Sequence, residues 1–211
     1  SAPRTFRVTV GGMHLAPVTV HHDGTQVGVF LDLPPRAVRA LFGVRPGDVC
    51  AQNLELADVA PGLARRLYDE LGAVAPDRRA AVCARVIDAS LGEADTPRTD
   101  PDAARAWQLL SDARGRISVS RLVELSGWSA RRLTSVFTAE YGLGPKQAAR
   151  LFRFDHARRR VESGEPVSEV AAGCGYSDQA HLTREFATFT GHPPRTFLTV
   201  RAGEFDGAAT Y

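Results

Sequence analysis

Two groups of polar side chains in the second half of the sequence have the chemistry needed to read base-pair edges. Arginine is the commonest bidentate partner of guanine, glutamine can pair with adenine, and threonine or alanine can meet the methyl group of thymine. The two groups, each on one face at helical spacing, are Arg131, Thr134 and Ser135, and then Gln179, Ala180, Thr183 and Arg184. Of these we most expect base contacts from Arg131, Gln179 and Arg184. Each could instead be an ordinary solvated surface residue, so the elements that carry them decide between the two interpretations.

Both groups lie within a duplicated sequence pattern. The first copy reads Gly127-Trp128-Ser129, then Leu133-Thr134, Phe137, Gly142 and Pro145. The second copy reads Gly175-Tyr176-Ser177, then Leu182-Thr183, Phe186, Gly191 and Pro194. The offset is 48 residues at the first glycine of each copy and 49 from the leucine onward, so the second copy carries one inserted residue near its start. A duplication of this size predicts two similar supersecondary modules.

Each copy has the sequence features of a helix-turn-helix. Gly127 and Gly175 stand where a helix must end in a left-handed conformation, which glycine adopts at little cost. Ser129 and Ser177 follow two residues later, where a hydroxyl can accept N–H bonds at the start of the next helix. The leucine and phenylalanine of each copy are four residues apart and therefore share the buried face of that second helix. Two such patterns in tandem predict two helix-turn-helix modules.

The segment Val167–Leu198, VSEVAAGCGYSDQAHLTREFATFTGHPPRTFL, resembles the signature region of the AraC/XylS family of bacterial transcription regulators. Residues 101–200, about half of the chain, resemble the whole two-module DNA-binding domain of that family. The resemblance implies sequence-specific binding of duplex DNA by two recognition helices joined by a linker helix. It places the groove-facing side chains at Arg131, Thr134, Ser135, Gln179, Ala180, His181 and Arg184. His181 suits a base or phosphate contact and a local cap about equally well.

Helical periodicity predicts the other elements of this half. We expect helices over 101–113, from a cap at Ser118 to Ser126, and over 130–141, 146–162 and 178–189, with Pro145 and Pro194 starting the helices that follow them. The buried positions of the two recognition helices are predicted to be Leu133, Val136, Phe137, Leu182, Phe186 and Phe189. Trp128 and Tyr176 are expected to pack at the turns rather than to stack on bases.

The segment 146–162 is predicted to be the helix that joins the modules. At 1.5 Å per residue it would span about 25 Å, which would set the recognition helices about one duplex turn, roughly 34 Å, apart. Its arginines, Arg150, Arg153, Arg158, Arg159 and Arg160, either reach phosphates or belong to an ordinary exposed charged helix. If phosphates are bound, log K should fall with log salt by about 0.9 per contact.

The first half of the sequence predicts a small domain of strands followed by helices. The segments Phe6–Val10, Val18–His22 and Gln26–Leu33 are rich in β-forming residues, and Asp23-Gly24 is a hairpin turn signal. Helices are expected over 35–42, 61–71 and 77–91. We therefore predict an α+β chain: residues 1–95 as an effector or dimerisation domain that resembles those of some family members, 101–200 as the all-α DNA-binding domain, and 201–211 as a flexible tail. Because three strands make a poor independent sheet, we expect further strands before residue 1 in the parent protein.

Composition indicates a cytoplasmic protein with unevenly placed charge. No apolar run approaches the roughly 18 residues that span a bilayer, and the start of the chain lacks a signal-peptide pattern, so no membrane partner is expected. The net charge is +2, but residues 101–200 carry 14 Lys/Arg and 10 Asp/Glu, a balance of +4 that leaves −2 for the remainder. This suits a DNA-binding module attached to another domain, although a normally solvated surface gives the same modest excess. The expected partner is promoter or operator DNA, with RNA polymerase, a small-molecule effector and a second copy of the chain as further candidates.

An enzyme is the rival class of function. Some relatives of the AraC/XylS family join the same DNA-binding domain to an alkyl-accepting cysteine domain, which needs an activated thiolate, usually in a zinc–cysteine cluster. Cys50, Cys83 and Cys174 are scattered, and Cys83 lies on an apolar helical pattern typical of a core. His21-His22-Asp23 resembles a metal cluster, but adjacent histidines of a strand point to opposite faces. We therefore expect no catalytic residues, no metal and no cofactor. A third class, a ligand-binding or dimerisation protein whose DNA-binding domain has lost activity, stays open.

Overall fold

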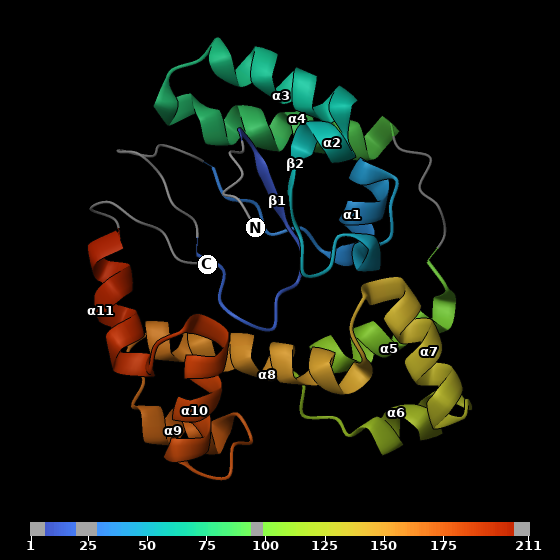
Figure 1. Ribbon diagram of the computed structural model, residues 1–211, viewed down its shortest axis with the longest axis vertical. Helices are drawn as coiled ribbons and strands as arrows, with labels where there is room; N and C mark the ends of the chain where they lie inside the picture. The colour runs from blue at the N-terminus through green and yellow to red at the C-terminus, as the bar shows by residue number, and fades with distance from the viewer. Residues whose placement is uncertain (1–6, 20–28, 94–98, 205–211) are drawn as a thin grey trace. The chain divides into compact units, whose positions relative to one another are not determined.

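The computed structural model describes residues 7–19, 29–93 and 99–204, and within them the chain is mainly helical (Figure 1). These residues divide into two compact units. The first unit comprises 7–13, 29–93, 99 and 140–142, and the second comprises 14–19, 100–139 and 143–204. The His21-His22-Asp23 cluster and the Asp23-Gly24 turn lie outside the described residues, as do residues 94–98 and the end of the predicted tail.

The first unit combines a two-stranded sheet with helices. The sheet pairs β1 (Thr9–Gly11) antiparallel with β2 (Asn53–Glu55), in a register that sets Val10 opposite Leu54. The helices are α1 (Pro35–Phe42), α2 (Leu56–Val59), α3 (Pro61–Gly72) and α4 (Arg79–Glu93), with short 3-10 turns η1 (Pro46–Asp48) and η2 (Pro76–Arg78). Their apolar faces enclose one core, which includes Leu56, Leu63, Leu67, Cys83, Val86 and Ile87. The predicted class, a small α+β region ahead of an all-α half, is confirmed.

The strands of this unit differ from those that the sequence predicts. In the structure β1 pairs with β2. The strand β2 has only three residues, too few for an alternation of apolar and polar side chains to indicate a strand in the sequence. The described part of the predicted strand Gln26–Leu33, residues 29–33, has no regular structure. Pro34 and Pro35 follow it directly, and proline cannot donate a ladder hydrogen bond. The same prolines start α1, which covers the predicted residues 35–42 and is followed by Gly43 in the left-handed conformation (φ 69°).

Glu55, at the end of β2, is the polar anchor of the first unit. Its carboxylate accepts hydrogen bonds from the amides of Arg7 (2.6 Å) and Val8 (3.2 Å) and from the hydroxyl of Tyr68 (2.7 Å). Burial, together with the neighbouring carboxylate, raises the pKa of Tyr68 to about 12. Burial alone would raise the pKa of Glu55, but the hydrogen bonds outweigh it, so the pKa of Glu55 is lowered.

We expect the first unit to lose stability as pH falls through the folded-state pKa of Glu55. A carboxyl with a lowered pKa stabilises the fold above its unfolded pKa, about 4.3, and that contribution disappears as the folded state is protonated. Amide-exchange protection of β1 and β2, corrected for intrinsic rates, should therefore decrease below about pH 4. Glu55→Gln should lack this acid-dependent decrease, and an unchanged acid response in that variant would assign the effect to another group.

The second unit is all-helical, as predicted. Its helices are α5 (Pro101–Asp112), α6 (Val119–Ser126), α7 (Ala130–Tyr141), α8 (Pro145–Glu162), α9 (Val167–Gly173), α10 (Gln179–Thr190) and α11 (Pro194–Glu204). Pro145 and Pro194 each occupy the first position of a helix, where the missing N–H costs nothing. The helix α11 continues past residue 200, where the sequence predicts the domain to end. No helix in the described part of the chain is both long and apolar enough to cross a membrane.

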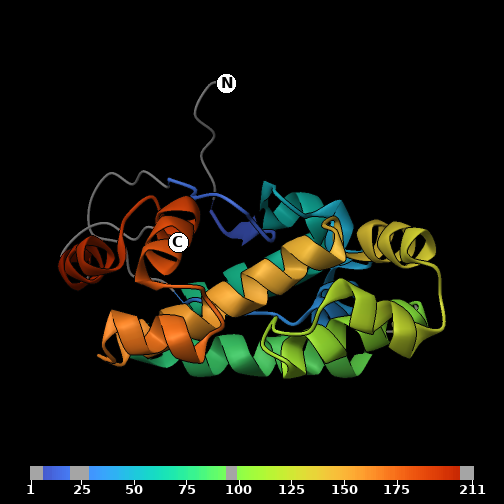
Figure 2. The ribbon, with the colours of Figure 1, turned by 90° about the horizontal axis from the view of Figure 1, so that it is seen from below.

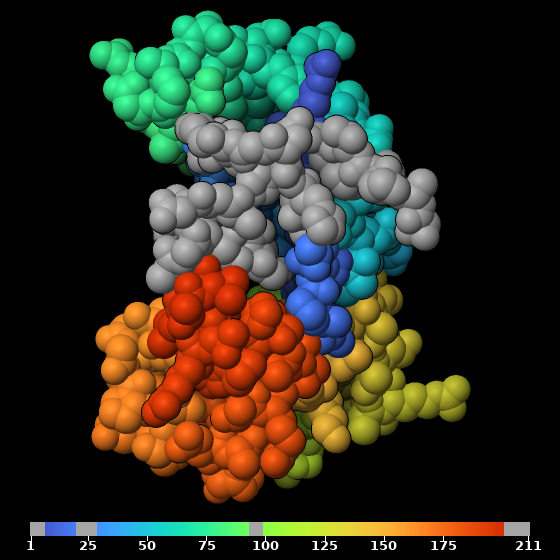
Figure 3. All heavy atoms as spheres, turned by 60° about the vertical axis from the view of Figure 1, so that its left-hand side comes forward, coloured from blue at the N-terminus to red at the C-terminus, as the bar shows by residue number. Residues whose placement is uncertain are grey.

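The helix α8 runs through the second unit without interruption, with α5–α7 toward its start and α9–α11 toward its end (Figures 1 and 2). Near the middle of α8, Phe152 meets Trp107 edge-on (ring centroids 4.9 Å apart), and Trp107 packs in turn on Phe137 (6.1 Å). Two residues further along α8, Phe154 stacks on Phe189 at 4.5 Å and meets Phe186 edge-on at 5.1 Å. From α5, Ala103, Ala106 and Leu110 are buried, whereas Ala104 is exposed. The helices α9–α11 form one continuous surface, orange to red in Figure 3.

Candidate nucleic-acid interface

The first helix-turn-helix module consists of α6, a short turn and α7. Gly127 ends α6 with φ +68°, and its amide donates to the carbonyl of Val123. The hydroxyl of Ser129 accepts a hydrogen bond from the amide of Arg132 at 3.3 Å, which confirms the predicted cap of α7. Leu133 and Phe137 are fully buried. The face of α7 opposite to them is therefore free to contact a partner.

The second module consists of α9, a turn and α10, and its cap differs from the predicted one. Gly175 has φ +77°, as expected where the first helix ends. The residue that caps α10 is Asp178, whose carboxylate accepts from the amide of His181 at 2.6 Å. Ser177, the predicted cap, instead donates its hydroxyl hydrogen to Asp178 (3.2 Å). The cap moves because the second copy has one extra residue between its serine and its leucine, and Asp178 stands four residues before Leu182, as Ser129 does before Leu133.

The predicted base-reading positions lie on the sides of α7 and α10 that face away from these cores. Leu182 and Phe186 are fully buried and Phe189 nearly so, which confirms the predicted core of α10, and Val136 is half-buried. The exposed side chains are those of Arg131, Thr134, Ser135, Gln179, Ala180 and Arg184, while Thr183 and His181 are half-buried. Six of the seven predicted contact residues are thus accessible to a ligand of this surface.

His181 is held by its own turn. Its Nδ1 lies 3.2 Å from the hydroxyl of Ser177 and 3.4 Å from the amide of that residue. Its ring also meets the ring of Tyr176 edge-on, with centroids 5.2 Å apart. Of the two roles considered for His181, these contacts favour the local cap.

The turn aromatics pack within the modules. Tyr176 is buried, and Trp128 is half-buried with the guanidinium of Arg132 4.6 Å from its ring centroid. Arg132 and His181 both directly precede the core leucine of their copy, so the same position supports the turn aromatic in each module. These positions agree with the expectation that the aromatics pack at the turns.

The five arginines of α8 form ion pairs within the protein. The pairs are Arg150–Glu185, Arg153–Glu185, Arg158–Asp155, Arg158–Glu162, Arg159–Asp155 and Arg160–Glu165, with N···O distances from 2.5 to 3.0 Å. The three arginines near the end of the helix, Arg158, Arg159 and Arg160, pair with acidic residues close to them in the sequence. This arrangement favours the interpretation of an ordinary exposed charged helix over phosphate binding at that end. The two nearer its start differ, because both converge on one buried carboxylate.

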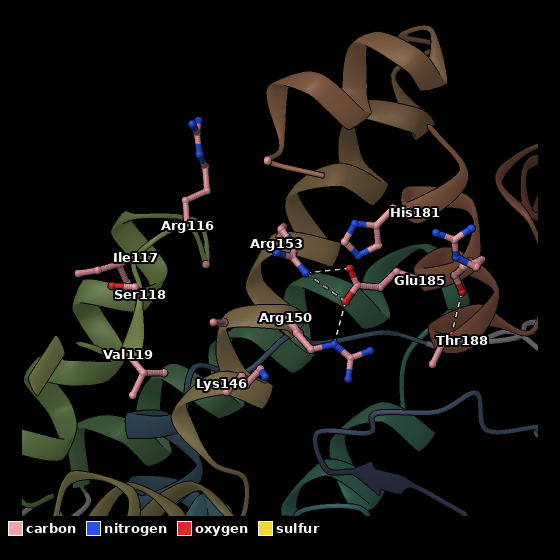
Figure 4. Close-up of a pocket in the computed structure, with 14 residues that line it drawn as sticks. Arg116, Ile117, Ser118, Val119, Lys146, Arg150, Arg153, His181, Glu185 and Thr188 are labelled. Carbon is pink, nitrogen blue, oxygen red and sulfur yellow. Dashed lines mark hydrogen bonds and ion pairs between the residues drawn. The ribbon is translucent and has the colours of Figure 1, made fainter. Parts of the chain in front are cut away.

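That carboxylate, Glu185, was missed by the sequence interpretation. Its side chain is only 4% exposed, and it accepts hydrogen bonds from Nε of Arg150 (2.9 Å) and Nη2 of Arg153 (3.0 Å) (Figure 4). The equivalent residue of the first copy is Val136. The signal available in the sequence was an acidic residue at a position that is apolar in the first copy. The ion pairs of Glu185 with Arg150 and Arg153 account for this difference, because they attach α10 to α8.

A groove of about 790 Å³ lies in the second unit between the start of α6, α8 and α10 (Figure 4). It is lined by Gly115, Arg116, Ile117, Ser118, Val119, Lys146, Ala149, Arg150, Arg153, Gly175, His181, Arg184, Glu185 and Thr188. Five of these residues are Lys or Arg, against one carboxylate. The groove therefore suits a polyanion.

Thiolate and metal chemistry find little support in the described residues. Cys83 and Cys174 are buried and Cys50 is partly so, and burial raises the pKa of the Cys50 and Cys83 thiols, which disfavours the reactive thiolate. Within residues 7–19, 29–93 and 99–204, no group of three or more His, Cys, Asp or Glu side chains converges as a metal site requires.

Comparison with known proteins identifies the class of the second unit. The model of a helix-turn-helix domain family matches residues 122–199. An HTH-type transcriptional regulator of Mycobacterium tuberculosis is 30% identical over 100 residues, which cover 47% of this chain and 39% of that protein. An uncharacterized HTH-type transcriptional regulator of Staphylococcus aureus is 30% identical over 82 residues, or 38% of this chain and 11% of the relative. The chain thus spans well under half the length of these relatives.

Solved structures give matches over the same half of the chain. The C-terminal domain of AraT, a response regulator from Geobacillus stearothermophilus, is 21% identical with a TM-score of 0.46 and covers 50% of this chain and 89% of that one. A probable AraC family transcriptional regulator from Rhodopseudomonas palustris is 24% identical with a TM-score of 0.43, over 48% and 97% of the two chains.

The chain therefore carries a helix-turn-helix DNA-binding domain of the kind found in transcription regulators. More particularly, this is a domain of the AraC/XylS type, as the signature in the sequence indicated. The matched proteins above are named as transcriptional regulators.

Proposed function

We propose that the protein is a sequence-specific transcription regulator that sets α7 and α10 into two successive major grooves of a promoter site. The observation that carries this proposal is the placement of two modules, each with a buried apolar face and an exposed polar face, toward opposite ends of α8. At 1.5 Å per residue the 18 residues of α8 span about 27 Å. With the widths of the two helices added, this approaches the roughly 34 Å repeat of the duplex.

The two reading surfaces carry different chemistry. In α7 the exposed set is Arg131, Thr134 and Ser135, which suits guanine and a thymine methyl. In α10 Gln179 suits adenine, Ala180 a thymine methyl and Arg184 guanine. Because the sets differ, one chain is expected to recognise an asymmetric site.

The first unit is proposed to sense a small molecule or to mediate dimerisation. It has its own apolar core, distinct from that of the DNA-binding unit. RNA polymerase is a further proposed partner, since a regulator bound at a promoter works through the transcription machinery. Sedimentation of the full chain across a concentration series would test the dimer.

The proposed DNA contacts are tested by first selecting bound sequences from a random duplex pool and then measuring variants on the selected site. Arg131→Ala and Arg184→Ala should each weaken specific binding by about 1–3 kcal/mol and relax the preference at one base pair. The two relaxed positions should lie about one helical turn apart, because each arginine belongs to a different module.

Arg159→Ala is the matched control for these two variants. It removes the same charge from an exposed side chain of α8 that pairs locally with Asp155. It should leave the base preference unchanged. If no sequence were enriched by the wild-type chain, the proposed function would be wrong. If a site were enriched but both reading variants bound it normally, only the contact assignment would be wrong.

A further inference from the structure

We propose that the groove bounded by α6, α8 and α10 holds the phosphodiester backbone of the DNA strand that passes between the two reading helices. Arg116, Lys146 and Arg150 are the residues assigned to bind its phosphates. The inference rests on the proposed function and adds a second, sequence-independent contact surface to it.

The first argument is charge. The groove is lined by five cationic residues and by one carboxylate, Glu185, which is 4% exposed and already bound by Arg150 and Arg153. Arg116 and Lys146 are exposed, and no carboxylate of the described residues forms an ion pair with either. The groove consequently presents unneutralised positive charge to the solvent, unlike the end of α8, where Arg158 and Arg159 are paired with acidic neighbours.

The second argument is the orientation of Arg150. Its Nε donates to Oε1 of Glu185 at 2.9 Å, while its side chain stays 40% exposed. The guanidinium is planar, and a bond from Nε leaves its far edge, with one N–H from each Nη, unused by Glu185 (Figure 4). A guanidinium held in this way can offer two parallel N–H donors to a phosphate without first losing side-chain freedom. Glu185 is thus a positioning residue for Arg150.

Arg153 has a different role in the same cluster. Its Nη2 contacts both oxygens of Glu185, at 3.4 and 3.0 Å, and its guanidinium lies 4.7 Å from the ring centroid of Tyr176. These contacts fix it against the core of the second module. We therefore assign Arg153 to the support of Glu185 and not to the phosphates.

The third argument is location. The groove lies between the first module, through Arg116 and the start of α6, and the second, through α10. A duplex read by both α7 and α10 must carry its backbone across the region between the modules, since successive major grooves are separated by a minor groove and its flanking phosphates. Backbone contacts of this kind fix the register of a protein on DNA and carry no sequence information.

The test is a charge-removing double variant, Arg116→Gln/Lys146→Gln, made in the full chain. Its affinity for the selected site and for an unrelated duplex would be measured from about 50 to 200 mM salt. We expect the slope of log K against log salt to become shallower by about 1.8, at about 0.9 per phosphate. If the two phosphate contacts contribute nothing to the affinity at 1 M salt, this change in slope means that the double variant binds about 60-fold more weakly than the wild type at 0.1 M salt. Both duplexes should weaken equally, and the base preference should not change.

The control is Arg121→Gln/Arg159→Gln, which removes two charges from exposed side chains that lie outside the groove and pair with Glu124 and Asp155. Its slope should stay close to that of the wild type. The inference is overturned if the groove variant keeps the wild-type slope, if the control lowers the slope as much, or if the groove variant changes the base preference. Absence of any enriched site in the wild type would instead overturn the proposed function. Circular dichroism melting of both variants would verify that they are folded.

Discussion

Replacing Gly115 by alanine is expected to lower the free energy of unfolding of the second unit by about 2–5 kcal/mol. Gly115 follows α5 with φ +70°, a conformation that costs alanine about 1–2 kcal/mol. A Cβ at this position would lie 2.0 Å from the carbonyl oxygen of Ala149 and 2.8 Å from the amide nitrogen of Arg153. Both atoms belong to the backbone of α8, which cannot yield as a flexible side chain would. The connection from α5 to α6 would therefore have to move off α8.

Gly127→Ala separates the cost of the left-handed backbone conformation from the cost of the steric clash with α8. Gly127 has nearly the same backbone conformation (φ +68°), but no atom lies within 4 Å of an added Cβ. It should lose only the conformational part, about 1–2 kcal/mol. Urea unfolding followed by the fluorescence of Trp107 and Trp128, the two tryptophans of the chain and both in the second unit, would measure each variant. Equal losses in the two variants would show that α8 yields easily at the point of contact.

Removing the buried carboxylate is the second change with a large expected effect. Glu185→Ala should destabilise the second unit by about 2–4 kcal/mol, because it leaves two arginines beside a core without their partner. This expected loss is smaller than the roughly 3–5 kcal/mol typical of breaking a fully buried ion pair. The reason is that Arg150 and Arg153 are 40% and 22% exposed, so both can be hydrated by water when Glu185 is removed. DNA affinity should fall as well, because Arg150 is no longer oriented toward the groove.

Glu185→Gln is the matched control, since it keeps the shape and one acceptor oxygen while removing the charge. It should fall between the wild type and Glu185→Ala in urea unfolding. A double-mutant cycle with Arg153→Ala should give a coupling energy of about 1–3 kcal/mol. A coupling near zero would mean that Glu185 acts through packing alone.

The helices of the second unit could be predicted because their signals are local. Gly127 and Gly175 mark helix ends by backbone conformation, and the spacing of Leu133 to Phe137 and of Leu182 to Phe186 marks the buried face. Each signal lies within a few residues of the feature that it predicts. The duplication then gave a second, independent instance of each.

The parts that the sequence did not predict depend on contacts between distant segments. Glu185 looks like one more polar residue of a surface helix, and its burial becomes evident only when α10 lies against Arg150 and Arg153 of α8. The groove joins residues from 115 to 188, so no single window of sequence contains it. In the first unit, β2 is three residues long and is defined by its partner β1 rather than by its own pattern.

The uninterrupted course of α8 has a consequence for the arrangement of sites on a chromosome. In the proposed complex, two unlike modules attached to one rigid helix would give the bound protein a direction along the DNA, unlike a symmetric dimer on a palindrome. An inverted site would be bound equally well but would turn the protein end for end. Since one base pair corresponds to roughly 34–36° of rotation at 10–10.5 base pairs per turn, inserting a single pair between the two half-sites would move one of them out of reach of its helix. Orientation and spacing would thus be as much a part of the recognised signal as the bases themselves.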